Sequence, residues 1–231
     1  MQWGTVAMID PTGIAPTRIL CDLGETGLSV AFSPDGKHLA AGAGDRTVRL
    51  FDAVTGRQRH VLKVHADWVQ SVSFSSDGGE LLTSSRDRTA RVIDPGKGAV
   101  IASYTNHDSP LLGAVFAPGG KRAWTLARGG VMHQWDAGNG QTKGEVKGAE
   151  FLQIAMSNGG LMALTAAGEL RRYPAESSKV DATFNVPAAP SAACIVSPDA
   201  TRLAIGGFDG QITIVESGTG KVVTQFLAQP K

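Results

Sequence analysis

Short stretches of alternating apolar and polar residues recur along the chain, with turn-forming residues between them. In residues 28–32, Leu28, Val30 and Phe32 fall on one face, and this period of two predicts a half-buried strand. The following SPDG (33–36) is typical of a tight turn, since Pro and Gly favour turn conformations. Three further strands are expected at HLAAG (38–42), TVRLFD (47–52) and the more polar RQRHVL (57–62).

This group of four strands and their turns is repeated. Its equivalent anchor residues are spaced 42, 42, 40 and 40 positions apart, at Ser33, Ser75, Ala117, Ser157 and Ser197. A period near 40 built from short strands is the signature of a β-propeller blade. The pattern therefore predicts an all-β chain of four-stranded antiparallel sheets that stack on one another, because one such sheet cannot bury both of its faces.

The repeats predict a single domain over residues 1–231, with a partial blade at 1–27 and repeats starting near residues 28, 69, 111, 151 and 191. WGTVAMID (3–10) matches a third strand and KVVTQFL (221–227) is interpreted as a lone fourth strand of a next blade. This count leaves five three-strand units with one piece at each end. The hypothesis is a fragment of a longer propeller, an incomplete ring whose open edges favour self-association; a closed six-blade form is the alternative.

The repeats also share local motifs. The third strands end in FD, ID, WD, YP and VE, and DRT turns occur at 45–47 and 87–89. These motifs resemble the Trp-Asp (WD) repeat family, in a form similar to its bacterial members. The family's buried hydrogen-bond network joins a His, a Ser or Thr, an Asp and a Trp. The positions that match this network are His65, Thr83 or Ser85, and Asp87, then His107, Thr125 and Trp135, and finally Asp45 and Asp209. The fourth repeat has neither His nor Asp there and is expected to be the loosest.

Composition argues against a catalytic or metal-binding reading. The net charge is +1, and the two cysteines, Cys21 and Cys194, form neither a zinc motif nor a disulfide framework. His65 and His107 occupy equivalent positions in different repeats, whereas a metal site would need them to converge; His38, His60 and His133 are expected at the surface. We expect no cofactor, no metal, no nucleic acid and no membrane partner. A cytoplasmic location is predicted, since no signal peptide pattern opens the sequence.

The function predicted from the resemblance is a non-enzymatic scaffold whose loops bind protein or peptide partners. Polar residues near those loops that the fold does not explain are candidate partner-binding residues, and the arginines among them form a candidate basic patch for an acidic partner, with ordinary solvated loops as the alternative. They are Asp67, Arg86, Arg88, Asn106 and Arg128. Trp68 is expected to serve packing. Two other functions stay open, a ligand-binding or enzymatic propeller that uses a central channel and a periplasmic propeller module.

Overall fold

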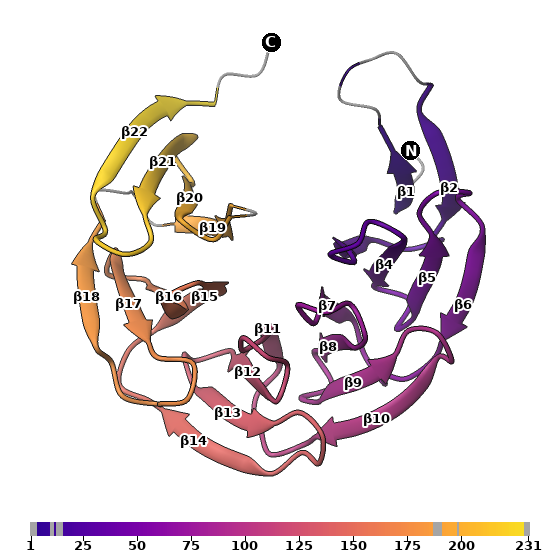
Figure 1. Ribbon diagram of the computed structural model, residues 1–231, viewed down its shortest axis with the longest axis horizontal. Coiled ribbons are helices and arrows are strands. Elements are labelled where there is room, and N and C mark those ends of the chain that lie inside the picture. Colours follow the sequence, from indigo (N-terminus) through magenta and orange to yellow (C-terminus); the bar gives the residue numbers. More distant parts are fainter. Residues whose placement is uncertain (1–3, 10–11, 13–15, 187–190, 198, 229–231) are drawn as a thin grey trace. The chain divides into compact units, whose positions relative to one another are not determined.

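The computed structural model describes residues 4–9, 12, 16–186, 191–197 and 199–228, and all of its regular elements in these ranges are β-strands (Figure 1). A two-stranded N-terminal sheet is followed by five four-stranded sheets, each an antiparallel meander in chain order. The N-terminal sheet contains β1 (Thr5–Met8) and β2 (Arg18–Asp22). Sheet 1 contains β3 (Gly27–Phe32), β4 (His38–Ala43), β5 (Val48–Asp52) and β6 (Gln58–Leu62).

The remaining four sheets have the same order of strands. Sheet 2 contains β7 (Val69–Phe74), β8 (Leu81–Ser85), β9 (Ala90–Asp94) and β10 (Ala99–Tyr104). Sheet 3 contains β11 (Leu111–Phe116), β12 (Arg122–Ala127), β13 (Met132–Asp136) and β14 (Thr142–Val146). Sheet 4 contains β15 (Phe151–Ser157), β16 (Gly160–Thr165), β17 (Glu169–Tyr173) and β18 (Ala182–Asn185). Sheet 5 contains β19 (Ser191–Val196), β20 (Arg202–Gly207), β21 (Gln211–Glu216) and β22 (Val222–Leu227).

The strands of sheet 1 confirm the sequence-based reading of one repeat, but the reading of the C-terminal segment was wrong. β22 is not a lone strand, because it pairs antiparallel with β21 and so completes sheet 5. The five repeats are therefore four-stranded sheets, not three-stranded units with a leftover piece. The prediction failed because a turn separates the fourth strand from the third, so residues 221–227 were assigned to a next repeat.

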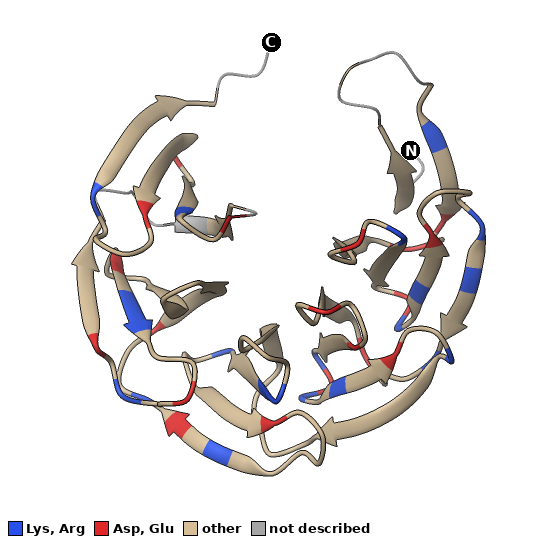
Figure 2. Cartoon of the chain, in the orientation of Figure 1, with Lys and Arg blue, Asp and Glu red and all other residues tan. Residues whose placement is uncertain are grey.

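Contacts divide the chain into two compact units. The first comprises residues 1–114 and 138–140, and the second comprises residues 115–137 and 141–231. In both units charged residues lie mainly in turns and on outer strands such as β2, β6 and β14 (Figure 2). The single-domain assignment stays a prediction.

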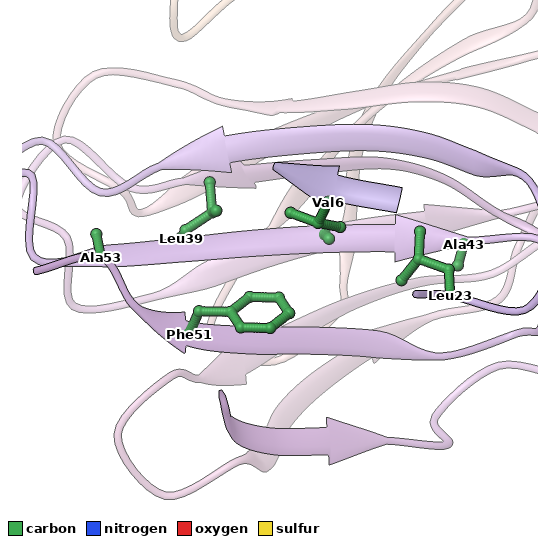
Figure 3. Close-up of a cluster of buried hydrophobic side chains, with 7 residues drawn as sticks. Val6, Leu23, Leu39, Ala43, Phe51 and Ala53 are labelled. Carbon is green, nitrogen blue, oxygen red and sulfur yellow. The ribbon is translucent and has the colours of Figure 1, made fainter. Parts of the chain in front are cut away.

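Apolar side chains fill the space between neighbouring sheets within each unit. In the first unit, Val6 and Leu23 lie against Leu39, Ala43 and Phe51 of sheet 1 (Figure 3). The next layer of that unit joins sheets 1 and 2 through Ala40, Val48, Leu50, Val69, Val72, Leu81 and Ile93. In the second unit, sheets 4 and 5 bury Met162, Leu164, Leu170, Leu203, Ile205 and Val215 between them. Burial of apolar area in these layers stabilises sheets that could not stand alone.

Candidate functional site: a loop platform on sheet 2

A buried hydrogen-bond network joins the loop before β7 to the turn after β8. The Nδ1–H of His65 donates to the carboxylate of Asp87 at 3.0 Å, and its Nε2 lies 2.8 Å from the hydroxyl of Thr83. The imidazole and hydroxyl are buried, so water cannot replace these bonds without cost. The structure thus brings together His65, Thr83 and Asp87 from three separate points of the repeat.

The carboxylate of Asp87 accepts hydrogen bonds from both loops. One carboxylate oxygen also accepts the backbone N–H of Ala66 at 2.9 Å, and the other accepts the N–H and hydroxyl of Thr89 at 2.9 and 2.6 Å. Partial burial by itself raises the pKa of Asp87, but the hydrogen bonds from His65, Thr89 and Ala66 outweigh it and hold the pKa well below its ordinary value. The carboxylate therefore stays ionised and keeps all of these donors satisfied at neutral pH.

Two more bonds fasten the same loops. The hydroxyl of Ser85 donates to the backbone oxygen of Asp67 at 3.0 Å, and the backbone N–H of Arg86 donates to the oxygen of Trp68 at 3.0 Å. Ser85 also accepts the N–H of Asp87 at 3.1 Å. Thr83 and Ser85, which the sequence offered as alternatives, thus have different roles. We call residues 65–68 and 85–88 the loop platform.

The loop platform exposes an aromatic ring and two guanidinium groups. Trp68 is 39% exposed, and the guanidinium carbon of Arg86 lies 4.7 Å from the centre of its ring, a distance suited to a cation–π contact. The expectation that Trp68 serves packing stays a prediction. Arg88 is exposed at a turn position with φ of 72°. Among the described residues, neither Arg86 nor Arg88 forms an ion pair.

The other residues of the predicted patch are placed differently. Asp67 is half-buried, and its carboxylate accepts the N–H of Trp68 at 2.7 Å. Asn106 is exposed in the same unit. Arg128 is exposed in the second unit, so it is a separate feature and not a described part of the platform.

In sheet 1, Arg49 bonds the turn aspartate Asp45, whereas in sheet 2 His65 bonds the turn aspartate Asp87. Asp45 accepts the N–H and hydroxyl of Thr47 at 3.0 and 2.6 Å and pairs with Arg49 at 2.7 Å. Arg49 also donates to the backbone oxygens of Asp22 and Leu23 at 2.8 and 3.3 Å. Sequence reasoning missed Arg49, although its place four residues after Asp45 on the third strand was a usable signal.

The remaining predicted network residues lie in or next to sheets 3 and 5. His107 is buried and meets Tyr104 edge-on at a ring distance of 5.6 Å in the first unit. Thr125 is buried in the second unit, where its hydroxyl donates to the oxygen of His133 at 3.5 Å, and Trp135 is fully buried. Asp209 is exposed and accepts the N–H of Gln211 at 2.9 Å. Assigning Asp209 to a buried network was therefore wrong, because a short Asp side chain bonds its own turn when no buried partner is brought to it.

The expectation of a surface position for His133 is also corrected. His133 is buried, and its Nε2 lies 3.1 Å from Glu145 on the next strand. Hydrogen bonds from Lys147 and then His133 lower the pKa of Glu145. This pair is a cross-strand contact within sheet 3.

Elsewhere the described residues offer little reactive chemistry. No group of three or more potential metal ligands occurs among them, and none of them lies in a helix with the length and apolar character needed to cross a membrane. Cys21 and Cys194 are free thiols. Burial raises the pKa of Cys194 to about 12, so its reactive thiolate form is disfavoured.

Comparison with known proteins agrees with this geometry. Residues 25–52 and 56–94 match the family described as "WD domain, G-beta repeat", or WD40. These two segments are similar to WD40 repeats. The chain superimposes on the β-propeller domain of Cps50 (Swd1) from Myceliophteria thermophila with a TM-score of 0.78 at 16% identity, covering 87% of this chain and 72% of that one. At that identity the likeness shows the fold alone, a β-propeller.

A curated relative matches a shorter stretch. A "Probable serine/threonine-protein kinase PkwA" from Thermomonospora curvata is 40% identical over 62 residues, which is 27% of this chain and 8% of the kinase. The matched stretch is too small a part of that protein to carry its activity over to this chain. WD40 β-propellers are in general non-enzymatic and bind protein partners.

Proposed function

We propose that this WD40 propeller is a non-enzymatic protein-interaction module whose loop platform binds an acidic segment of a partner protein. The supporting observation is the pair of exposed guanidinium groups, Arg86 and Arg88, beside a half-exposed Trp68. Neither guanidinium has an ion-pair partner within the described ranges, so both are available to a carboxylate.

The rigidity of the loop platform also supports this proposal. The bonds made by His65, Ser85 and Asp87 fix the platform before any partner arrives. A preformed site loses less conformational entropy on binding than a flexible loop does. Aromatic and arginine side chains are also the types that contribute most to protein interfaces.

A cytoplasmic location belongs to the same proposal. The two free thiols support it, since reducing compartments preserve unpaired cysteines. The other functions considered from sequence, in which a central channel holds a ligand or the propeller works in the periplasm, have no specific observation in their favour.

Charge reversal tests the proposal. An acidic peptide with one aromatic residue, such as a Glu-rich nonamer containing Tyr, is titrated against the wild-type chain and against Arg86→Glu/Arg88→Glu. We expect the double variant to lose on the order of tenfold or more in affinity, with the wild-type affinity falling as salt rises.

Two controls make the result decisive. Arg57→Glu changes another exposed arginine of the same unit that is not part of the platform and should leave binding nearly unchanged. Arg128→Glu tests the remaining arginine of the predicted patch by itself. Equal loss in Arg57→Glu, or no loss in the platform variant with its fold intact, contradicts the proposal.

A further inference from the structure

A polar cleft lies between sheets 1 and 2, at their turns between the third and fourth strands. It has a volume of about 420 Å³, and its lining comprises Asp52, Thr55 and residues 57–60 of sheet 1 and Gly96 of sheet 2. Both sheets are complete meanders of four strands within the first unit. A cleft of this size suits a small molecule.

A β-bulge brings four consecutive residues to this cleft. Gln58 pairs with Phe51 and His60 pairs with Leu50, so Arg59 is the extra residue that the register between β5 and β6 skips. In a regular strand neighbouring side chains point to opposite faces, whereas a bulge re-aims them. Residues 57–60 therefore line the cleft together.

The fold does not require polar residues at these positions. The registers of the two fourth strands place Arg-Gln-Arg-His at 57–60 where the next sheet has Ala-Val-Ile-Ala at 99–102. Figure 2 accordingly marks charge on β6 and none on β10. Since β10 forms the same kind of strand with apolar residues, the cationic side chains of β6 are available for a role other than folding.

Hydrogen bonds fix the walls of the cleft. The Nε2–H of His60 donates to the backbone oxygen of Gly96 at 3.2 Å and so joins the two sheets. The N–H and the hydroxyl of Thr55 donate to one carboxylate oxygen of Asp52 at 2.8 and 2.9 Å, and Arg59 donates to the other at 3.3 Å. The cleft is thus formed before any ligand arrives, which lowers the entropic cost of binding.

The lining has an excess of positive charge. Asp52 is its one acidic residue in the described part of the chain, and Thr55 and Arg59 already bond both of its oxygens. Arg57 is exposed and forms no ion pair with any described residue. Arg59 meets Asp52 through one nitrogen and keeps other N–H groups. Guanidinium groups with free N–H donors suit phosphate oxygens, which they bind in pairs.

We infer that this cleft binds a soluble phosphate monoester, with the phosphate on Arg57 and Arg59. A phosphate group fills only part of the volume, and the amide of Gln58 can bond hydroxyl groups of the organic part. The ligand class is therefore a small hydroxylated phosphate such as a sugar phosphate. The cleft shares no residue with the loop platform, so this inference goes beyond the proposed function and fails independently of it.

Glucose 6-phosphate is the probe, titrated against the full chain by calorimetry. We expect a 1:1 complex that shifts the amide NMR signals of residues 55–60 and Gly96. Glucose should not bind, because it lacks the phosphate, and inorganic phosphate should bind more weakly, because it lacks the organic part. A phosphoserine peptide that binds as tightly as glucose 6-phosphate would assign the cleft to a phosphoprotein and overturn the inference.

A pair of arginine variants locates the site. Arg57→Gln should lower the affinity for glucose 6-phosphate on the order of tenfold or more. It should leave the free energy of unfolding nearly unchanged, since the side chain is exposed. Arg46→Gln makes the same change of charge at an exposed arginine of the same unit outside the cleft and should leave the affinity nearly unchanged.

Gly96→Val tests the cleft without a change of charge. Gly96 has no positive φ, and Val54 occupies the equivalent position in sheet 1, so the turn accepts the side chain. An added Cβ would meet the carboxylate of Asp94 at 3.3 Å. The added side chain narrows the cleft and should weaken binding of glucose 6-phosphate, with the fold checked by urea unfolding.

Three further results would overturn the inference. They are glucose 6-phosphate that does not bind, an equal loss of affinity in the Arg46→Gln control, and full affinity in both Arg57→Gln and Gly96→Val. The two proposals remain distinguishable, because Arg57→Glu should lose glucose 6-phosphate while it keeps the acidic peptide of the loop platform.

Discussion

Sheets 2 and 4 hold equivalent loops by different means. In sheet 2 the buried His65, Thr83 and Asp87 fasten the loops through polar bonds. Sheet 4 has neither the His nor the Asp. Its equivalent loops are joined by the backbone bond from the N–H of Ala166 to the oxygen of Glu150 at 2.8 Å, and its strands bury apolar side chains such as Leu161 and Leu164 completely, as those of sheet 2 do. The comparison shows that this architecture does not require a buried His–Asp network, so that network in sheet 2 is free to serve the position of the loops that it joins.

The largest loss of stability is expected from a substitution in the apolar core of sheet 4. Leu164→Ala removes a side chain with 0% exposure from the cluster between sheets 4 and 5. It should lower the free energy of unfolding by about 2–5 kcal/mol, because a cavity is left that the surroundings fill only partly. Urea unfolding measures this loss. Ile195→Ala, at an exposed apolar position, is the matched control and should change stability by less than about 0.5 kcal/mol.

A smaller loss of stability is expected from a substitution in the polar network of sheet 2. Asp87→Ala leaves His65, Ala66 and Thr89 without their acceptor and should cost about 1–3 kcal/mol in the free energy of unfolding. Asp209→Ala removes the equivalent but exposed aspartate and should cost less than about 1 kcal/mol. If both substitutions lower the free energy of unfolding equally, Asp87 stabilises only its own turn, and its bonds to His65 and Ala66 add no stability.

The same carboxylate predicts a dependence on pH. Since the pKa of Asp87 is lower in the folded state than its ordinary value of about 3.9, its contribution is fully present above pH 4 or so. The contribution is lost as pH falls from there through the folded pKa. Asp35 and Asp199, with pKa values lowered to about 2 by hydrogen bonds from Ser33 and Ser197, behave alike in wild type and in Asp87→Asn.

The difference between the two proteins in denaturant unfolding therefore isolates Asp87. It should be constant from pH 7 to about pH 4 and shrink at lower pH. A difference that grows as the pH falls below 4 would contradict the lowered pKa.

The smallest effect is expected from an ion pair of sheet 4. Arg171 bonds Glu169 at 2.7 Å, and both side chains are about one third exposed. Arg171→Gln should change the free energy of unfolding by less than about 1 kcal/mol, because water screens such a pair. A larger loss would mean that the contact of Arg171 with the ring of Phe151 stabilises sheet 4 as well.

The sequence predicted the strands and the network of sheet 2 because both depend on local patterns. Alternation placed β3 to β6, and the resemblance to the WD repeat family assigned His65 and Asp87 to one network. The pairing of Arg49 with Asp45 four residues before it was missed although it is local, whereas the bonds of Arg49 to the backbone oxygens of Asp22 and Leu23 join parts of the chain that no local pattern connects. The sequence also did not predict the exposure of Val30 and Phe32, because the same alternation occurs in β7, where a neighbouring strand covers the apolar residues. Trp3 and Asp10, the two ends of the strand predicted at 3–10, lie outside the described residues.

Hydrogen exchange at the amide of Arg86, combined with binding of the acidic peptide, tests most directly whether the polar network positions the platform. That amide donates to the oxygen of Trp68 at 3.0 Å. In Asp87→Ala we predict faster exchange there and weaker peptide binding, even though removal of a negative charge beside Arg86 and Arg88 favours an acidic ligand electrostatically. Unchanged exchange with tighter binding would contradict the account, because charge alone would then govern recognition.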